Sequence, residues 1–485
     1  MTWPRATEAA VPIVLLGLLA VVGVATIANL GQLGYDEAIY ASKARSYVSD
    51  LVVDWWRPYR PPGIAVAGTL AGVVGFNDLA VRAVALAGGL ATLALVWFVT
   101  RQLWDSRAAL FALLGAIGAP VVLGELPLFH NDVASAGLLL LLMWILWDQF
   151  ETRPAPTRML LLAPAVAAAA FYTRYGIVAG ILGIGLTVPL LWARRLLAHA
   201  RLVGATALVG VVLLLPHLVY AVSLTGSPLG VLAAARNVAD STEPSVALRS
   251  YVSWIRPRLF GAVPVALAVA GVGYAVAAAI AFALRRHGSD HLRRQLWLLL
   301  PAAIAAGITV LVSHAEARYL MFPVMLLIIS GAGAFSVAIS LLVRAPPLAG
   351  RIATLPVLCT LVVAIVLAGY AGAAAIRQLR DADGRPLAWQ TAGKRIAADA
   401  DGPCRVIAAV RPQIGWYTRC EILRMNEQTA DAVRADGSAT YVVFGNEAAL
   451  RPNVAAKYRD LVEGAVRLPP EGGGADEYEI YRLGP

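Results

Sequence analysis

Two adjacent carboxylates, Asp36 and Glu37, directly follow the first long apolar segment of the chain. They open a stretch with helical periodicity at the point where a membrane-spanning helix would end. An ionisable pair at a membrane surface costs free energy unless it is paired or used, so it is a candidate functional site. The alternative is structural, with Asp36 capping the helix and Glu37 interacting favourably with its macrodipole.

Other polar side chains lie at the ends of later apolar segments, and two arginines lie in the same loop as the acidic pair. A carboxylate can act as a general base, and arginines bind phosphate through forked, charge-assisted hydrogen bonds. Such a set suits group transfer from a lipid phosphate. The residues are Tyr35, Asp36, Glu37, Arg57, Arg60, Glu125, His130, Asn131, Asp132, Arg174, Glu316, Arg318 and Tyr319.

The composition places these residues in a membrane protein. Of the 485 residues, 59% are hydrophobic and 14% are charged, and the mean hydropathy is +0.69. Soluble domains carry roughly 25% charged residues. We therefore expect a polytopic α-helical protein with about eleven transmembrane helices. The expected spans are 11–30, 80–100, 108–124, 133–149, 159–173, 176–192, 202–222, 259–284, 296–312, 320–342 and 352–375.

The length of an apolar run separates spanning helices from other apolar segments. The run 11–30 follows Arg5 as in a signal peptide, but it is long enough to cross a bilayer, so we expect a retained first helix. The run 63–76 is too short to cross and fits an interfacial helix. It would lie in a first outer loop, residues 31–82, together with the acidic pair.

The distribution of arginine predicts the orientation in the membrane. The net charge is +10, but residues 376–485 contain 15 basic and 15 acidic side chains, so the excess lies in the membrane part. This argues against nucleic acid as a partner. The positive-inside rule makes the arginine-rich side cytoplasmic, with the N-terminus, and turns the acidic pair outwards. The loops on the cytoplasmic side are 101–107, 150–158, 194–201, 285–295 and 344–351.

The sequence of residues 376–485 predicts a small extracytoplasmic α/β domain. It follows a membrane domain of residues 1–375. In an oxidising compartment Cys404 and Cys420 would form a disulfide worth roughly 3 kcal/mol, and two free thiols are the alternative. Cys359 lies in an expected span and is expected to pack there. The expected strands are 405–410, 440–444 and 478–482, and the expected helices are 390–400, 427–435 and 454–463.

Several of these segments resemble motifs of the GT-C-fold glycosyltransferases, in the branch of the protein O-mannosyltransferases and lipid A aminoarabinose transferases. Tyr35-Asp36-Glu37-Ala38 resembles the Asp-Glu motif after the first helix, and Arg60-Pro61-Pro62-Gly63 resembles the basic-Pro-Pro motif of the same loop. His130-Asn131-Asp132 is similar to the second acidic position. Glu316-Ala317-Arg318-Tyr319-Leu320 is similar to the Arg-Tyr motif, and Thr173-Arg174-Tyr175-Gly176 to a corner of many relatives.

The resemblance covers residues 10–375, and two departures limit what it implies. Arg60 stands where the aminoarabinose enzymes often carry lysine, and the C-terminal region is short. The identity of the acceptor therefore does not transfer.

The resemblance implies transfer of a sugar from a polyprenyl-phosphate donor to a lipid, glycan or protein acceptor by a single inverting displacement. The expected place is the outer face of a bacterial inner membrane, with the lipid bilayer as a further partner. Asp36 would be the base, and Glu37 and Asp132 are the other catalytic candidates. The remaining assignments are Arg57, Arg60, Arg174 and Arg318 for the donor phosphate, and Tyr35, His130, Asn131, Glu316 and Tyr319 for the shape of the substrate site. A divalent metal ion is the one candidate cofactor, with Asp36, Asp132 and His130 as candidate ligands.

Structural alternatives stand beside these assignments. Asp132 and Glu125 could cap helices, and His130 could serve only as a hydrogen-bonding group. Arg174 and Arg318 could be interfacial anchors whose heads snorkel to water. The tryptophans near expected span ends, Trp55, Trp56 and Trp254, fit an aromatic belt.

A transporter or flippase of lipid-linked glycans is the alternative from another functional class. A transporter would place charged residues at span centres and paired broken helices in related halves. The ionisable residues of this chain cluster at span ends instead. An enzyme resembling the O-antigen ligases would carry its key residues in a large late outer loop, and no loop between the late expected spans is that long.

Overall fold

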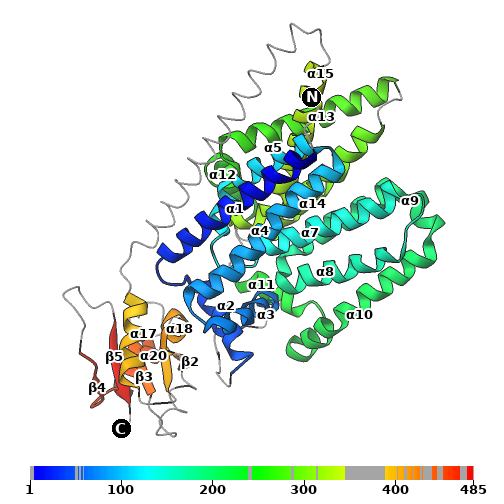
Figure 1. Cartoon of the computed structure of the whole chain (residues 1–485). Helices are drawn as coiled ribbons and strands as arrows, with labels where there is room; N and C mark the ends of the chain where they lie inside the picture. Colours follow the sequence, from blue (N-terminus) through cyan, green and yellow to red (C-terminus); the bar gives the residue numbers. More distant parts are fainter. Residues whose placement is uncertain are drawn as a thin grey trace.

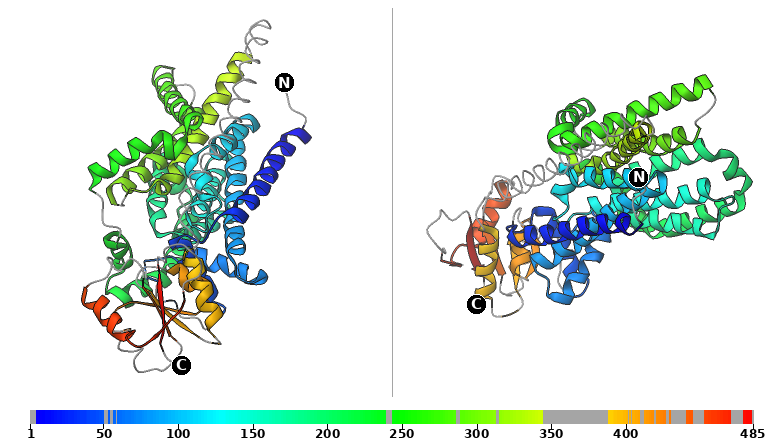
Figure 2. Two further views of the ribbon diagram at one scale, coloured as in Figure 1. Left: turned by 90° about the vertical axis from the view of Figure 1, so that its left-hand side faces the viewer. Right: turned by 45° about the horizontal axis from the view of Figure 1, so that its top comes forward.

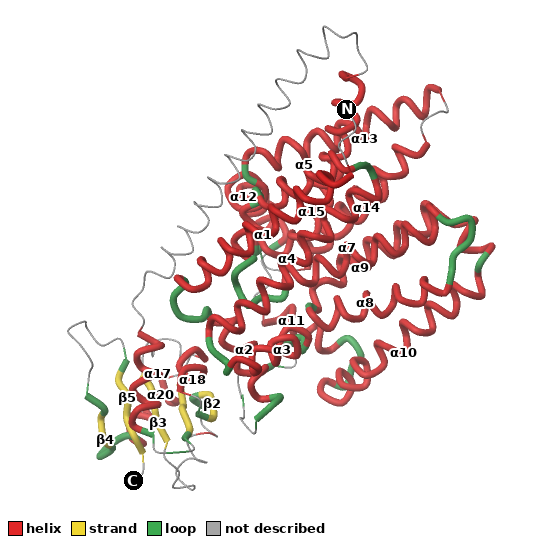
Figure 3. The backbone as a smooth tube through the Cα atoms, viewed as in Figure 1, coloured by secondary structure: helices red, strands yellow, loops and turns green. Residues whose placement is uncertain are grey.

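The computed structural model shows an N-terminal helical bundle and a small C-terminal domain built on a sheet (Figure 1). All strands of the described chain belong to the C-terminal domain (Figure 3). The first long helix, α1 (Arg5–Asn29), begins at the end of the bundle that lies away from this domain (Figure 2). The structure describes residues 5–49, 53, 56–57, 59–238, 243–285, 289–312, 315–343, 388–400, 402, 404–408, 412–418, 420–426, 429, 440–444, 452–469 and 478–483.

Eight helical segments of the described chain are long and apolar enough to cross a membrane, which confirms the polytopic architecture. The expected eleventh span, 352–375, lies outside the described residues. The long helices after α1 are α4 (Asp78–Leu103), α7 (Asp132–Trp147), α9 (Val178–Ala198), α10 (Ala200–Thr225), α13 (Ala262–Arg285), α14 (Ser289–Val312) and α15 (Met321–Val343).

Two expected spans contain shorter helices. The run 159–173 holds a 3₁₀ turn, Arg158–Leu161, and α8 (Leu162–Thr173). The run 108–124 is divided into α5 (Ser106–Ile117) and α6 (Pro120–Glu125). Pro120 explains the division, because proline has no N–H for the preceding turn and favours the first position of a new helix.

Short helices connect the long ones at the end of the bundle nearest the C-terminal domain. The run 63–76 forms a short helix as expected, with the side chains of Leu70, Val73 and Val74 exposed. Such an apolar face suits the boundary between headgroups and acyl chains. The connecting helices are α2 (Tyr35–Ser46), α3 (Gly63–Gly68) with the 3₁₀ helix Thr69–Val74, α11 (Gly230–Val238) and α12 (Pro244–Trp254).

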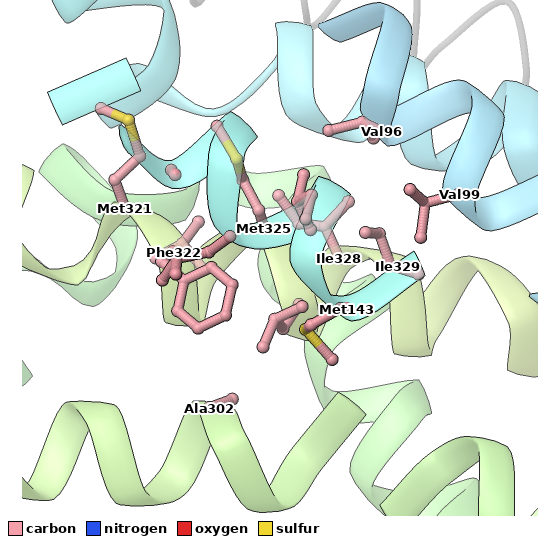
Figure 4. Packing of buried hydrophobic residues seen from close by; sticks show 14 of the residues in the cluster. Val96, Val99, Met143, Ala302, Met321, Phe322, Met325, Ile328 and Ile329 are labelled. Carbon is pink, nitrogen blue, oxygen red and sulfur yellow. The ribbon is translucent and has the colours of Figure 1, made fainter. Parts of the chain in front are cut away.

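Close packing holds the long helices together around α15. Met325 of α15, Val96 of α4 and Met143 of α7 belong to one buried apolar cluster (Figure 4). Lipid tails are as apolar as these side chains, so helix association in a bilayer relies on close contact rather than on escape from water. At Gly331 of α15 a Cβ atom would lie 1.9 Å from the backbone oxygen of Leu267 on α13, so only glycine permits this approach.

The C-terminal domain is a mixed five-stranded sheet in the order β2-β1-β3-β5-β4. Strand β1 runs parallel to β2 and β3, and β5 runs antiparallel to β3 and β4. The structure confirms the three expected strands and adds β2 and β4. The strands are β1 (Arg405–Ala408), β2 (Glu421–Arg424), β3 (Thr440–Phe444), β4 (Val466–Arg467) and β5 (Glu479–Leu483).

The helices of this domain are α17 (Ala388–Asp399), α18 (Pro412–Thr418) and α20 (Pro452–Leu461). The first and last were expected, whereas α18 was not, and the expected helix 427–435 lies almost entirely outside the described residues. Cys404 and Cys420 form a disulfide with their Cα atoms 4.7 Å apart. The expected domain boundary near residue 375 also lies outside the described residues.

Candidate active site

Helix α2 presents Asp36 in its first turn, between two arginines from distant parts of the chain. Gly34 is the N-cap, so Asp36 is not the helix cap. Asp36 Oδ1 accepts a hydrogen bond from Arg60 Nη1 at 2.9 Å, and Oδ2 accepts one from Arg318 Nη2 at 3.2 Å. Burial raises the pKa of Asp36, but the charges of Arg60 and Arg318 outweigh burial and hold the pKa well below its usual range. Asp36 is therefore an ionised carboxylate between two cations.

Glu37 belongs to a separate, buried network. Arg82 of α4 donates to both carboxylate oxygens of Glu37, from Nε at 3.0 Å and from Nη2 at 2.9 Å. The backbone N–H groups of Gly34 and Phe129 each donate to Glu37 at 2.8 Å. Burial raises the pKa of Glu37, and Arg82 together with these hydrogen bonds lowers it further than burial raises it. Glu37 therefore fixes the start of α2 against α4.

Asp132 is the first residue of α7, and its neighbour Asn131 is the N-cap. The Asp132 side chain is 1% exposed and forms an ion pair with Arg174, the residue that follows α8. Beyond this ion pair, neither carboxylate oxygen of Asp132 accepts a hydrogen bond from another described residue. Arg174 also donates to Asn131 Oδ1 at 3.3 Å. Asp132 thus brings a buried negative charge with free acceptor sites.

Glu125 and His130 form a carboxylate–imidazole pair beside Asp132. His130 Nδ1 lies 2.7 Å from Glu125 Oε2 and 3.4 Å from Arg318 Nη1. Burial lowers the pKa of His130, but the Glu125 carboxylate more than offsets this and raises the pKa above its usual value. Burial raises the pKa of Glu125, but the charge and hydrogen bond of His130 together with the charges of Arg318 and Arg174 outweigh burial and lower it.

A cation could be held where these groups meet. One donor atom from each of Glu125, His130 and Asp132 lies within 4.8 Å of the other two. Carboxylate oxygen and imidazole nitrogen together suit zinc or manganese. Two of the expected candidates, Asp132 and His130, belong to this cluster together with Glu125. Asp36 contacts two arginines instead.

The short 3₁₀ helix Ala317–Leu320, just before α15, supplies the remaining charged groups. Arg318 forms an ion pair with Glu316 as well as with Asp36. The Arg174 guanidinium lies 4.5 Å from the centroid of the Tyr319 ring, a cation–π distance. Arg318 and Arg174 are each fixed by two or more partners, which preorganises both cations.

These elements surround a cavity of about 600 Å³. Its walls combine the charged groups with apolar side chains of α14 and α15, among them Ile308 and Phe322. A cavity of this size with a few convergent polar groups is typical of a ligand-binding site. The polar residues at its wall include Asp36, Tyr40, Tyr59, Arg60, His130, Asn131, Asp132, Arg174, Glu316, Arg318 and Tyr319.

Four of the expected residues do not line this cavity, and one of them, Glu125, contacts it through His130. Glu37 is buried in its network with Arg82. Tyr35 is 37% exposed, and Arg57 lies half-buried in the loop before Arg60. The structure thus brings most of the predicted residues together at one cavity, whereas Tyr35, Glu37, Arg57 and Glu125 are not part of its wall.

Sequence reasoning missed several residues of this region, among them Tyr40 and Arg82. Tyr40 lies one helical turn after Asp36, and its hydroxyl accepts a hydrogen bond from Asn131 Nδ2 at 3.3 Å. The spacing of four residues on a helix could have indicated that Tyr40 shares the face of Asp36. Arg82 could have been noticed as a lone arginine beside a long apolar run, since such residues are paired.

Comparisons with known proteins identify the fold that carries this cavity. Residues 60–220, about a third of the chain, match the family model described as dolichyl-phosphate-mannose-protein mannosyltransferase. No curated protein sequence matches the chain. The matched part includes Arg60, Asp132 and Arg174 but not α2 or Arg318.

Solved structures show the same fold over almost the whole chain. ArnT from Cupriavidus metallidurans, bound to undecaprenyl phosphate, aligns with a TM-score of 0.66 and 14% sequence identity, covering 97% of each chain. The oligosaccharyltransferase AglB from Archaeoglobus fulgidus, in complex with an inhibitory peptide and a dolichol-phosphate, aligns with a TM-score of 0.56 and 15% identity. That match covers 93% of this chain and 70% of AglB. The likeness confirms the GT-C fold.

Proposed function

We propose that this protein is a membrane glycosyltransferase that uses a polyprenyl-phosphate-linked sugar as its donor. The observation that supports this most directly is the meeting of Asp36 with Arg60 and Arg318 at the wall of one cavity. Transfer of a sugar from a lipid phosphate requires a base that takes the acceptor proton and cations that bind the leaving phosphate. The match to a dolichyl-phosphate-mannose-dependent family and the undecaprenyl phosphate bound to ArnT indicate the same donor class.

The proposed reaction is a single displacement at the anomeric carbon. The acceptor oxygen or nitrogen forms a bond to this carbon while its proton passes to the Asp36 carboxylate. The bond between the anomeric carbon and the phosphate oxygen breaks, and polyprenyl phosphate leaves with that electron pair. The configuration at the anomeric carbon is therefore inverted.

The arginines stabilise the charge that develops on the leaving phosphate. Arg60 and Arg318 already contact Asp36, and Arg174 lines the same cavity. Cations fixed before the reaction act without a reorganisation cost. Because these cations hold the pKa of Asp36 low, Asp36 is ionised at neutral pH in the resting site but weakly basic, and it acts mainly by its position.

Asp132 has a supporting role in this proposal. Its buried carboxylate pairs with Arg174 and keeps acceptor sites free for a substrate hydroxyl or amine. A divalent cation bound by Glu125, His130 and Asp132 would supply a further positive charge beside the phosphate. Arg57 and Tyr35 would take part only at the mouth of the site, since neither lines the cavity.

The proposed location is a bacterial inner membrane with the cavity and the C-terminal domain on the outer face. The charge bias of the loops supports this orientation. Impermeant thiol labelling of single cysteines introduced at Ser49 and Arg194, both exposed, provides the test. Labelling at position 49 and protection at position 194 in intact cells are expected, and the reverse pattern would refute the orientation.

The activity is tested with purified protein in nanodiscs and radiolabelled polyprenyl-phosphate mannose, glucose and aminoarabinose. Lipid A, an oligosaccharide lipid and a peptide serve as acceptors. We expect transfer from one donor, loss of at least about 100-fold in D36N, and an inverted anomeric centre by NMR. D148N is the matched control, because Asp148 pairs with Arg153 outside the cavity.

The outcome separates the two functional classes. Movement of intact labelled donor across the bilayer without release of polyprenyl phosphate would favour a flippase. Equal turnover by D36N and D148N would refute Asp36 as the base.

A further inference from the structure

The C-terminal domain touches the helix that carries Asp36. Its helix α18 packs against α2, and the two lie side by side where the domain meets the bundle (Figure 1). Trp416, at 2% exposure, belongs to the same buried cluster as Leu33 and Tyr40 of the membrane domain. The contact therefore continues the apolar core around α2.

Tyr417 of α18 fixes the N-terminal end of α2. Its hydroxyl donates to Asp78 Oδ2 at 2.6 Å and accepts a hydrogen bond from the backbone N–H of Leu33 at 2.8 Å. Leu33 lies immediately before the N-cap, Gly34. Asp78 lies one turn before Arg82 on α4, so Tyr417 joins the two elements that Arg82 and Glu37 also join.

Trp416 fixes the other end of α2. Arg45, in the last turn of α2, donates to the carbonyl oxygen of Trp416 at 3.1 Å. The Arg45 guanidinium also lies 4.0 Å from the centroid of the Trp416 ring. The Trp416 indole N–H in turn donates to Asp78 Oδ1 at 2.6 Å. Two consecutive residues of α18 thus hold both ends of α2 and the start of α4.

The disulfide closes the segment that contains α18. Cys404 lies just before β1 and Cys420 just after α18, so the bond joins the two ends of the segment that presents Trp416 and Tyr417. A cross-link around a segment reduces its conformational freedom. Trp416 and Tyr417 are therefore held in place within the C-terminal domain as well as by their contacts with the membrane domain.

We propose that Trp416 and Tyr417 are positioning residues that clamp α2 and thereby set the place of Asp36 in the cavity. This inference rests on the proposed function, because it assigns a role to the C-terminal domain in the same reaction. The clamp acts on the catalytic carboxylate through α2, whereas Arg174 is held by Asn131, Asp132 and Tyr319. Loss of the clamp should therefore reduce kcat more than it weakens donor binding.

The test combines hydrogen exchange with kinetics on the full chain in nanodiscs. The variant is Y417F, which removes one hydroxyl and keeps the ring. Y458F is the matched control, because its hydroxyl bonds to Asn426 within the C-terminal domain. We expect amides of residues 33–46 to exchange about tenfold faster in Y417F than in Y458F. We also expect kcat to fall about tenfold with the donor KM changed by less than about twofold.

A double-variant cycle distinguishes a clamp from a general loss of stability. D78A removes the membrane-side acceptor of the same hydrogen bond, so D78A and Y417F combined should be no slower than the slower single variant. Additive losses, or unchanged exchange of residues 33–46 in Y417F, would overturn the proposal. If the wild-type protein transfers no sugar from any donor, the proposed function fails, and the exchange measurement alone still decides whether the clamp exists.

Discussion

Replacing Glu37 by glutamine should destabilise the fold, because Glu37 and Arg82 form a buried ion pair. The two side chains are 2% and 1% exposed, so neither can find water once its partner is changed. E37Q keeps the shape of the side chain but removes its charge. It also replaces one acceptor oxygen by an NH₂ group that faces donors, since Arg82 and two backbone N–H groups all donate to this carboxylate.

The expected magnitude follows from this geometry. Breaking a buried pair by altering one partner costs roughly 3–5 kcal/mol, because the other charge remains buried and uncompensated. In E37Q, Arg82 keeps two hydrogen bonds to the carbonyl oxygens of Gly31 and Gln32. Its charge is therefore still partly compensated, and the loss of stability should lie at the lower end of this range. We therefore expect a loss of about 3 kcal/mol in the free energy of unfolding.

Thermal unfolding of the purified protein in one detergent measures this change, and D36N provides the comparison. The Asp36 side chain is 28% exposed, so its neutralisation should change the unfolding midpoint far less. We expect D36N to be folded and inactive, and E37Q to be unstable with activity that falls in proportion to the folded fraction.

The opposite pattern would refute this account of the acidic pair. An E37Q protein as stable as wild type and as inactive as D36N would make Glu37 a reacting group. The bidentate contact with Arg82 would then be a feature of the resting state only.

Three further predictions concern charge and cross-linking. In R60Q the pKa of Asp36 should rise, because the charge of Arg60 that lowers this pKa is lost. The acid limb of the pH profile of kcat/KM should therefore move to higher pH, and superimposable profiles of R60Q and wild type would contradict this. In E125Q the pKa of His130 should fall, because Glu125 raises it, so His130 should lose its proton at lower pH in an NMR titration; an unchanged titration would contradict the pairing. Serine at both Cys404 and Cys420 should cost the C-terminal domain about 3 kcal/mol, measured as a lower unfolding midpoint than that of the oxidised wild type; equal midpoints would show that the disulfide does not stabilise the domain.

The architecture was largely predictable because hydrophobic runs report directly on membrane spans. Apolar length predicted α1, α4 and α10, and the short run 63–76 predicted a helix that does not cross. The broken span at Pro120 was missed, because an apolar run alone does not show where a backbone donor is lacking. The strand β4 was missed because it has only two residues, and β2 was missed because only two of its four residues, Ile422 and Leu423, are apolar.

Much of the site was predictable because its residues are charged and lie at the ends of apolar runs. Asp36, Asp132 and Arg318 were all found in this way, and the structure places all three at one cavity. Which carboxylate meets which arginine was not predictable, since the partners are far apart in the sequence. The pairing of Glu37 with Arg82, rather than with an arginine of the cavity, depends on how α2 packs against α4.

The role of α18 was also hidden in the sequence. Tyr417 belongs to the C-terminal domain, yet its hydroxyl reaches Asp78 and Leu33 of the membrane domain. A contact between domains leaves no periodic pattern, because it joins single residues rather than whole faces of helices.

The most direct test of the central claim is the lipid pool of cells that carry D36N in place of the wild-type chain. Lipid extracts analysed by mass spectrometry should show accumulated polyprenyl-phosphate sugar and the loss of one sugar modification of the cell envelope. The same extracts from D148N cells should match wild type. An unchanged lipid pool with fully retained glycan modification in D36N cells would contradict the assignment of Asp36 as the base of a polyprenyl-phosphate-dependent glycosyltransferase.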